Sequence, residues 1–132
     1  MTTLKIQYSN YEEGEFTNEQ IVDYPSFIEI FEKETNNKIY TKYSWSLENN
    51  RLKFYINTDN EYFLIIEHIA KNYYNLTFCE TKFKKAYECK LEKEILAEYL
   101  NLFFNKEYDY FHNKFNKTNK ETDTIINRFN KK

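Results

Sequence analysis

Between residues 40 and 79, hydrophobic and polar positions alternate in a way that predicts three consecutive β-strands. Asn49 and Asn50 would form the first turn, because Asn tolerates positive φ. The predicted pairs across this turn are Leu47 with Leu52, Trp45 with Phe54, and Tyr43 with Ile56. All of them lie on one face, and the opposite face is polar, as in a sheet with one side in water. A one-residue slip would expose Trp45 and Phe54, so the pattern favours a single register.

The strands after Asn57 continue the meander. With loops at residues 58–60 and 70–72, the predicted pairs are Phe54 with Leu64, Leu52 with Ile66, Leu64 with Phe78, Ile66 with Leu76, and His68 with Tyr74. A further strand is predicted over residues 86–91, with Tyr87, Cys89 and Leu91 facing inward. The apolar face is therefore expected to continue across the sheet.

The chain ahead of these strands predicts a strand and a helix. Residues 3–9 alternate, with Leu4, Ile6 and Tyr8 on one face, and residues 16–24 could include a short returning strand. Pro25 is predicted at the first position of a helix, where its missing N–H costs nothing. The core stripe of this helix would be Phe27, Ile30 and Phe31.

A second amphipathic helix is predicted over residues 92–105. Its apolar stripe is Ile95, Leu96, Tyr99, Leu102 and Phe103. Alternation over residues 108–115 suggests a closing strand. Together the elements predict an α+β fold of two layers, in which an antiparallel meander of five to six strands packs against two helices.

The length of 132 residues suits one domain, expected over residues 1–115. Residues 116–132 form a polar, basic tail. Thr118 and Glu121 have capping-box spacing ahead of Ile125, Ile126 and Phe129, so the tail either docks as a short helix or frays. No apolar run could cross a bilayer and no signal peptide is visible, which predicts a cytoplasmic protein without membrane contact.

Charge is distributed unevenly although the net charge is only −2. Residues 1–34 hold eight acidic and two basic side chains, a net of −6, and residues 105–132 hold seven basic and four acidic ones, a net of +3. An acidic segment repels nucleic acid and attracts basic proteins, including nucleases. The simpler interpretation of this acidic segment is an ordinary solvated surface.

Few residues suggest chemistry. One glycine cannot supply a phosphate-binding loop, and no Ser, Cys or His occurs in a nucleophile setting. Cys79 and Cys89 are expected to be reduced thiols rather than zinc ligands. His68 is expected to be a structural hydrogen-bonding partner. The basic cluster at residues 82–87 is interpreted as an exposed loop, so no catalytic residue, metal, cofactor or nucleic-acid partner is predicted.

Several segments together resemble small bacterial immunity proteins of polymorphic toxin systems. They are the strand Leu4–Tyr8, the helix after Pro25, the strand ending in Tyr62–Ile66, the stretch Leu91-Glu-Lys-Glu-Ile, and Leu102-Phe-Phe. The resemblance spans residues 3–112. It implies a protein without catalytic activity that binds one cognate toxin and covers its active site or blocks a needed movement.

An inhibitor of this kind needs charge complementarity for encounter and aromatic anchors for residence. The candidate binding residues are Tyr11, Glu12, Glu13, Glu15 and Glu19. One alternative is a ligand-binding or enzymatic domain with an aromatic pocket under the sheet, using His68, Glu67 or a buried Tyr. Another is a mobile-element protein that inhibits a host defence enzyme. The chain is expected to be a monomer, or a weak homodimer through an unpaired edge strand.

Overall fold

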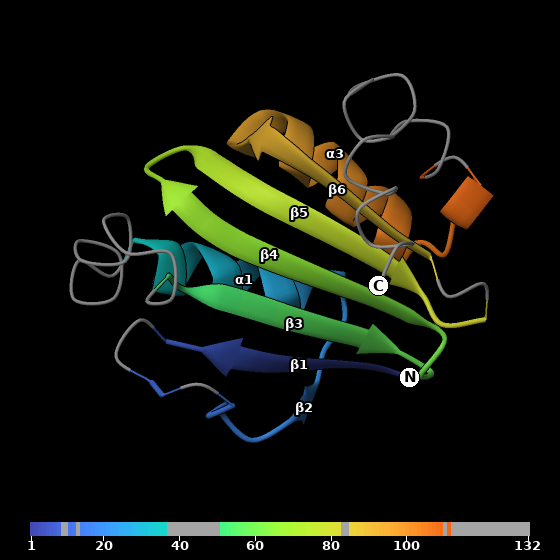
Figure 1. Cartoon of the computed structure of the whole chain (residues 1–132), viewed down its shortest axis with the longest axis horizontal. Coiled ribbons are helices and arrows are strands. Elements are labelled where there is room, and N and C mark those ends of the chain that lie inside the picture. The colour runs from blue at the N-terminus through green and yellow to red at the C-terminus, as the bar shows by residue number, and fades with distance from the viewer. Residues whose placement is uncertain (9–10, 13, 37–50, 83–84, 110, 112–132) are drawn as a thin grey trace.

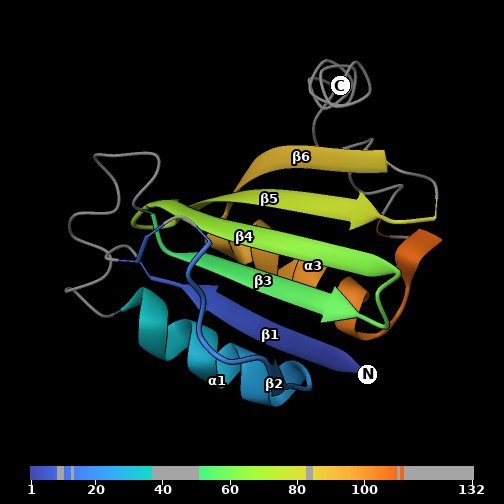
Figure 2. The same cartoon turned by 60° about the horizontal axis from the view of Figure 1, so that its bottom comes forward.

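A computed structural model of the chain describes residues 1–8, 11–12, 14–36, 51–82, 85–109 and 111 (Figure 1). The described elements are six strands and two helices: β1 (Thr2–Gln7), β2 (Gln20–Ile21), α1 (Tyr24–Thr35), β3 (Lys53–Thr58), β4 (Tyr62–Ala70), β5 (Tyr73–Glu80), β6 (Lys85–Glu92) and α3 (Lys93–Phe104). The strands form one antiparallel sheet in the order β2-β1-β3-β4-β5-β6. Both helices lie on the same face of this sheet (Figures 1 and 2), which confirms the predicted two-layer α+β fold.

The sheet registers confirm part of the predicted pairing. Leu64 lies opposite Phe78, Ile66 opposite Leu76, and His68 opposite Tyr74. The β3–β4 register differs from the prediction by two residues, because Phe54 faces Ile66 and Ile56 faces Leu64. The turn occupies residues 59–61 instead of 58–60. A shift of two leaves every side chain on its predicted face.

The shifted turn follows from backbone geometry. Asp59 and Asn60 have φ values of 53° and 59°, a region that Asp and Asn enter more easily than other residues with side chains. The Asn60 N–H donates to Asn57 Oδ1 at 2.9 Å. Thr58 stays in the strand, and its hydroxyl lies 3.1 Å from that of Thr2. These contacts favour the turn one residue later than alternation alone predicts.

The strands beside β3 contradict the first predicted hairpin. Residues 40–48, which were assigned to its first strand, lie outside the described residues. Phe54 faces Ile6 of β1 on one side and Ile66 of β4 on the other, and Ile56 faces Leu4 and Leu64. A strand has only two edges, so the predicted pairs of Trp45 with Phe54 and of Tyr43 with Ile56 are wrong.

Local sequence explains how α1 begins. Asp23 is the N-cap, and its carboxylate accepts from the Ser26 N–H at 2.9 Å while the Ser26 hydroxyl accepts from the Asp23 N–H. Pro25 is therefore the second helical residue, one position later than predicted. Phe27, Phe31 and Thr35 are buried and spaced four residues apart, whereas Ile30 is only partly buried.

Helix α3 buries a stripe close to the predicted one. Leu96, Tyr99, Leu100 and Phe103 are buried, and Ile95 and Leu102 pack at its margin. Together with α1 and the inward strand positions, these residues form a continuous core: Leu4, Ile6, Phe54, Ile56, Leu64, Ile66, Tyr74, Leu76, Phe78, Cys89 and Leu91 lie on the sheet side. Aromatic rings dominate it, with Phe27 against Phe54 and Phe78 against Phe103.

The closing strand predicted over residues 108–115 is wrong where the structure describes it. Residues 108, 109 and 111 are helical, and the Phe111 N–H donates to the Glu107 carbonyl at 3.0 Å. Tyr108 and Phe111 are three residues apart, so a helical turn directs both rings toward the core. Tyr108 stacks on Tyr62, and Phe111, fully buried, contacts Phe78. The tail at residues 116–132 lies outside the described residues.

Candidate functional site

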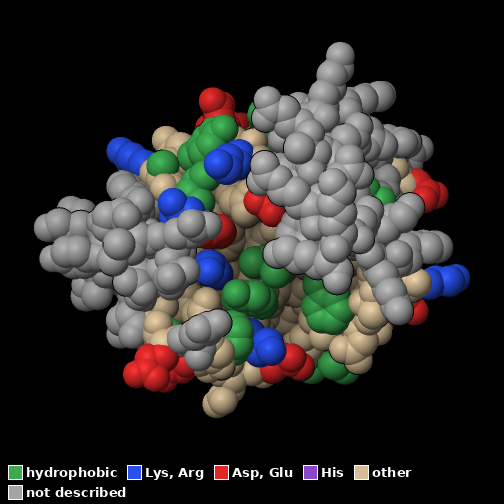
Figure 3. Space-filling view, viewed as in Figure 1, with side chains coloured by type: hydrophobic (Ala, Val, Ile, Leu, Met, Phe, Trp, Pro, Cys, Tyr) green, Lys and Arg blue, Asp and Glu red, His purple; other side chains and the backbone are tan. Residues whose placement is uncertain are grey.

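The outer face of the sheet is the face opposite α1 and α3 (Figures 1 and 2). Side chains alternate along each strand, so the odd-numbered residues of β1, β3, β4 and β5 point to this face while the even-numbered ones enter the core. Partly exposed side chains on it include Lys5, Tyr55, Asn57, Phe63, Ile65, Glu67, Thr77 and Cys79. Figure 3 shows hydrophobic side chains gathered near the middle of this face, with charged groups around them.

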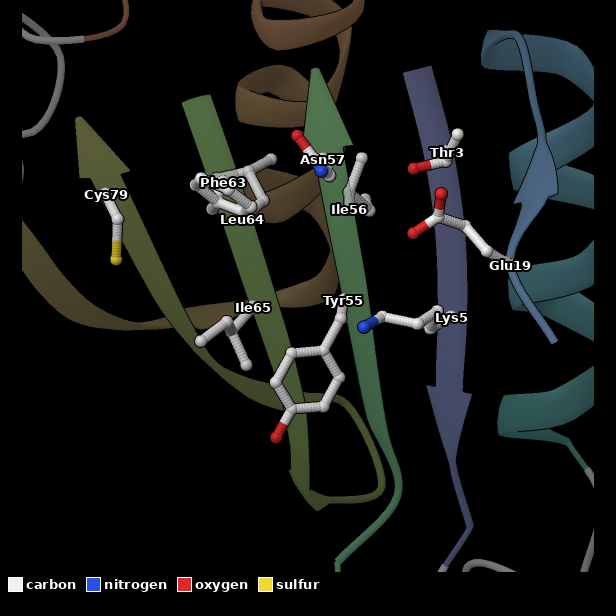
Figure 4. Close-up of a pocket in the computed structure, with 10 residues that line it drawn as sticks. All are labelled: Thr3, Lys5, Glu19, Tyr55, Ile56, Asn57, Phe63, Leu64, Ile65 and Cys79. Carbon is white, nitrogen blue, oxygen red and sulfur yellow. The ribbon is translucent and has the colours of Figure 1, made fainter. Parts of the chain in front are cut away.

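A hollow of about 300 Å³ lies over β1, β3, β4 and β5 on the outer face (Figure 4). Its lining residues are Thr3, Lys5, Glu19, Tyr55, Ile56, Asn57, Phe63, Leu64, Ile65 and Cys79. The polar groups of Thr3, Glu19 and Asn57 gather at one end, and the Lys5 ammonium extends toward Tyr55. Apolar side chains from β4 form the other wall. The hollow can therefore accept an apolar group that carries a polar or charged end.

The segment before β2 builds the rim of the hollow. The Thr17 N–H donates to the Ile6 carbonyl at 2.9 Å, and the Thr17 hydroxyl oxygen accepts from the Ile6 N–H at 2.9 Å. These bonds hold the segment beside β1. Phe16 packs edge-on against Tyr55 with ring centroids 4.9 Å apart, and Lys5 Nζ lies 4.9 Å from the Phe16 ring. This cation–π contact positions Lys5 at the hollow.

The predicted acidic residues divide between two places. Glu12 and Glu15 form one turn, in which the Glu15 N–H donates to the Glu12 carbonyl and the Glu12 N–H donates to Glu15 Oε1, both at 3.0 Å. Tyr11 directly precedes this turn, and its ring makes an edge-on contact with Tyr8. Glu19 is separate and lines the hollow, and Glu13 lies outside the described residues. The structure thus brings Glu12 and Glu15 together but places Glu19 elsewhere.

A second polar group lies on the same face. Arg51 Nη1 is 3.1 Å from Glu67 Oε2, and these side chains are 24% and 14% exposed. Tyr55 lies nearby, and burial, with the Glu67 charge as a smaller cause, raises the pKa of its phenol. The Tyr55 hydroxyl therefore remains protonated at neutral pH and can donate a hydrogen bond to a ligand.

His68 lies in the core instead of on the outer face. Its side chain is 1% exposed, its Nε2 is 3.2 Å from the Lys71 carbonyl, and its ring stacks on Tyr74 with centroids 4.8 Å apart. Burial lowers the pKa of His68 because the imidazolium loses hydration, and the Lys93 charge acts in the same direction. His68 is therefore neutral at physiological pH and does not line the hollow on the outer face.

Burial also raises the pKa values of both cysteines. Cys79 faces the outer side, and Cys89, fully buried with a pKa of about 12, faces the core. Both are free thiols, and they lie on the neighbouring strands β5 and β6. Their protonated state makes them weak nucleophiles. Within the described ranges, no group of three or more His, Cys, Asp or Glu side chains is placed to hold a metal ion.

The residues of the hollow were only partly anticipated. Glu19 was predicted from charge, whereas Lys5, Tyr55, Phe63 and Ile65 were not named. Phe63 and Ile65 carried a usable signal, because they are hydrophobic at outward positions of a strand whose inward positions are also hydrophobic. β1 and β3 are far apart in the chain, and no local pattern in either segment predicts that they pair.

Fold and face together define a two-layer α+β protein with one sheet face left uncovered by its described helices. None of the helices in the described part of the chain is long and apolar enough to span a membrane. Comparison with protein-family models, curated proteins and solved structures finds no match to this chain.

Proposed function

We propose that this protein is a non-catalytic binding protein that neutralises a cognate bacterial toxin by direct contact. The observation that carries the proposal is the contrast between the two sheet faces. The inner face is packed against α1 and α3 by buried aromatic and aliphatic side chains, whereas the outer face has a hollow of about 300 Å³ with apolar walls and charged rim groups. The outer face is therefore the surface that we assign to contact with the toxin.

The hollow has the features of an anchor site for a partner side chain. Phe63 and Ile65 offer partly exposed apolar surface, which is released from water when a partner covers it. The Tyr55 hydroxyl and the charges of Lys5 and Glu19 would orient the inserted group. Aromatic anchors in a desolvated pocket commonly dominate the binding free energy at protein interfaces.

Charge on the adjacent segment would accelerate encounter with a basic toxin such as a nuclease. Glu12, Glu15 and Glu19 are exposed, and residues 1–34 have a net charge of −6. Attraction between complementary surfaces raises the association rate constant and makes it fall as salt increases. Glu12 and Glu15 lie outside the hollow, and Phe63 and Ile65 are uncharged, so steering by the first pair and anchoring by the second can be measured separately, whereas Glu19 belongs to both surfaces.

The test uses the toxin domain encoded by the gene adjacent to this one in the source genome. Co-expression is expected to protect cells from that toxin, and the purified proteins are expected to bind. Replacing Glu12, Glu13, Glu15 and Glu19 by Lys should lower the association rate constant by about tenfold at low salt. Phe63→Ala should instead raise the dissociation rate constant by about tenfold.

The control compares the single variants Glu12→Lys and Glu29→Lys, which change the net charge equally, because Glu29 is exposed but belongs to α1 on the helical side of the molecule. The effect of Glu29→Lys on the association rate should be small. An unchanged association rate and salt dependence in the quadruple variant would exclude the acidic segment as the steering surface. Absence of binding between the two proteins would reject the proposal.

The volume of the hollow also favours a second candidate, a small-ligand-binding protein. About 300 Å³ is at the lower end of ligand pockets, and the site combines apolar walls with a few polar groups. This candidate would be supported if a small aromatic ligand bound the isolated protein and the variant Ile65→Trp, whose larger side chain fills the hollow, no longer bound it. A partner identified as a host defence enzyme would instead indicate a mobile-element inhibitor acting through the same face.

A further inference from the structure

Strand β6 forms one edge of the sheet. The opposite edge is β2, which has only two residues, whereas β6 has eight. Within the part of the chain that the structure describes, no strand pairs with the outer edge of β6 (Figure 2). A long edge strand offers a row of backbone N–H and carbonyl groups to another strand.

The hydrogen-bonding pattern shows which residues direct these groups outward. The Lys93 N–H donates to the Asn72 carbonyl at 3.0 Å, so these two residues form a hydrogen-bonded pair at the end of the β5–β6 ladder. Hydrogen-bonded pairs recur at every second residue of an antiparallel ladder. Leu91, Cys89 and Tyr87 therefore bond to β5. The backbone groups of Ala86, Glu88 and Lys90 and the N–H of Glu92 point away from the sheet, whereas the Glu92 carbonyl is at the N-cap of α3 and belongs to the helix.

We propose that β6 pairs in antiparallel orientation with β6 of a second copy of this chain. The two strands are related by a twofold axis at Cys89. Glu88 of each copy then lies opposite Lys90 of the other, and Ala86 lies opposite Glu92. The inference does not depend on toxin binding.

Charge selects this register over its neighbours. Outward backbone groups can bond only in registers that pair even-numbered residues with even-numbered residues. A twofold axis at Glu88 places the two Glu88 side chains opposite each other. An axis at Lys90 places Lys90 against Lys90 and Glu88 against Glu92. Like charges directly opposite destabilise a strand pair and opposite charges stabilise it.

The chosen register also gives the longest matched overlap. An axis at Leu91 would pair Lys90 with Glu92 but would engage only three residues, whereas the axis at Cys89 engages residues 86–92. Lys90 is exposed and Glu88 is partly exposed on the outer side. On the inner side, Tyr87 comes to lie opposite Leu91 of the second copy, which adds an apolar contact.

This dimer leaves the candidate site free. The hollow lies over β1, β3, β4 and β5, with its acidic rim next to β2, at the far edge of the sheet from β6. The two sheets would continue into one, with all four helices on the same side. Each copy would keep an open outer face, so the dimer could hold two partner molecules.

The experiment is a charge swap followed by sedimentation velocity from micromolar to millimolar protein. The wild-type chain is expected to show a concentration-dependent dimer. Glu88→Lys and Lys90→Glu should each raise the dimer dissociation constant by about tenfold, because each creates two like-charge contacts across the axis. The double variant Glu88→Lys/Lys90→Glu should restore the wild-type value. The control Glu29→Lys matches one single variant in charge change and should leave the constant unchanged.

A second measurement needs no variant. Amide hydrogen exchange of Glu88 and Lys90 should slow as wild-type concentration rises, since their N–H groups become bonded in the dimer, while exchange of Cys89 should not respond. A monomer at all concentrations, single variants that dimerise like the wild type, a double variant no better than the single ones, or concentration-independent exchange would each overturn the proposal.

Discussion

At the scale of single residues, His68 and Tyr55 show how burial sets chemical character. Burial lowers the pKa of His68 and keeps its side chain neutral in the core. The ring stacks on Tyr74 and its Nε2 contacts the Lys71 carbonyl, so the buried side chain has both an apolar and a polar partner. Tyr55 is kept protonated on the outer face by burial and the nearby Glu67 charge. Alternation along the strands placed His68 on the inner face and Tyr55 on the outer face, and tertiary packing sets how far each side chain is desolvated.

The lowered pKa of His68 predicts a pH-dependent stability. The unfolded chain binds a proton at His68 near pH 6.5 and the folded chain does not, so the free energy of unfolding should fall as pH decreases below that value. The slope should not exceed about 1.4 kcal/mol per pH unit, which corresponds to one proton. Urea denaturation between pH 7 and pH 5 measures it.

Removing the imidazole should remove this slope. His68→Gln is expected to destabilise the protein at pH 7 but to flatten the dependence between pH 7 and pH 5. His112→Gln is the matched control, since His112 is the other histidine of the chain. A slope that survives in His68→Gln and disappears in His112→Gln would show that His112, and not His68, causes the pH dependence.

At the scale of elements, the β3–β4 turn decides the register of two central strands. Alternation predicted the faces of β3 and β4 correctly, but it could not locate the turn, because a shift of two residues preserves the faces. Positive φ at Asp59 and Asn60 and the Asn57–Asn60 side-chain bonds located it one residue later. Turn chemistry, therefore, supplied information that hydrophobic periodicity lacks.

Asn60→Val should weaken this turn. A β-branched residue at a φ of 59° is strained, and the substitution also removes the bond to Asn57, so the free energy of unfolding should fall by about 1–2 kcal/mol. Asn60→Gly is the control, because glycine accepts the conformation. Chemical denaturation of both variants should show the valine variant as the less stable. Equal stability would mean that φ at this position contributes little.

At the scale of the whole molecule, one core joins the sheet to both helices. Phe27 and Phe31 of α1 contact Phe54, and Phe103 of α3 contacts Phe78. Lys93 at the start of α3 forms an ion pair with Glu32 of α1 at 2.9 Å between its nitrogen and the carboxylate oxygen. The described layers should consequently unfold as one cooperative unit.

Phe78→Ala should destabilise this unit as a whole. Phe78 is fully buried and contacts Phe103 and Phe111, so its truncation should lower the free energy of unfolding by about 3–5 kcal/mol. Far-ultraviolet circular dichroism and tyrosine fluorescence should shift together to lower urea concentration. Phe16→Ala, which removes a partly exposed ring, should cost much less. Separate transitions from the two probes would show that the layers unfold independently.

Periodicity within short segments was enough to predict the inward positions of β1 and β3 to β6, the location of the two helices and the β4–β5 register. Only the folded structure shows that β1 pairs with β3, that residues 108, 109 and 111 are helical, and that Lys5 and Glu19 line one hollow. The physical reason is that alternation records only whether a side chain is buried. Which strand supplies the neighbouring hydrogen bonds depends on contacts between segments far apart in the chain, and no local pattern encodes that choice.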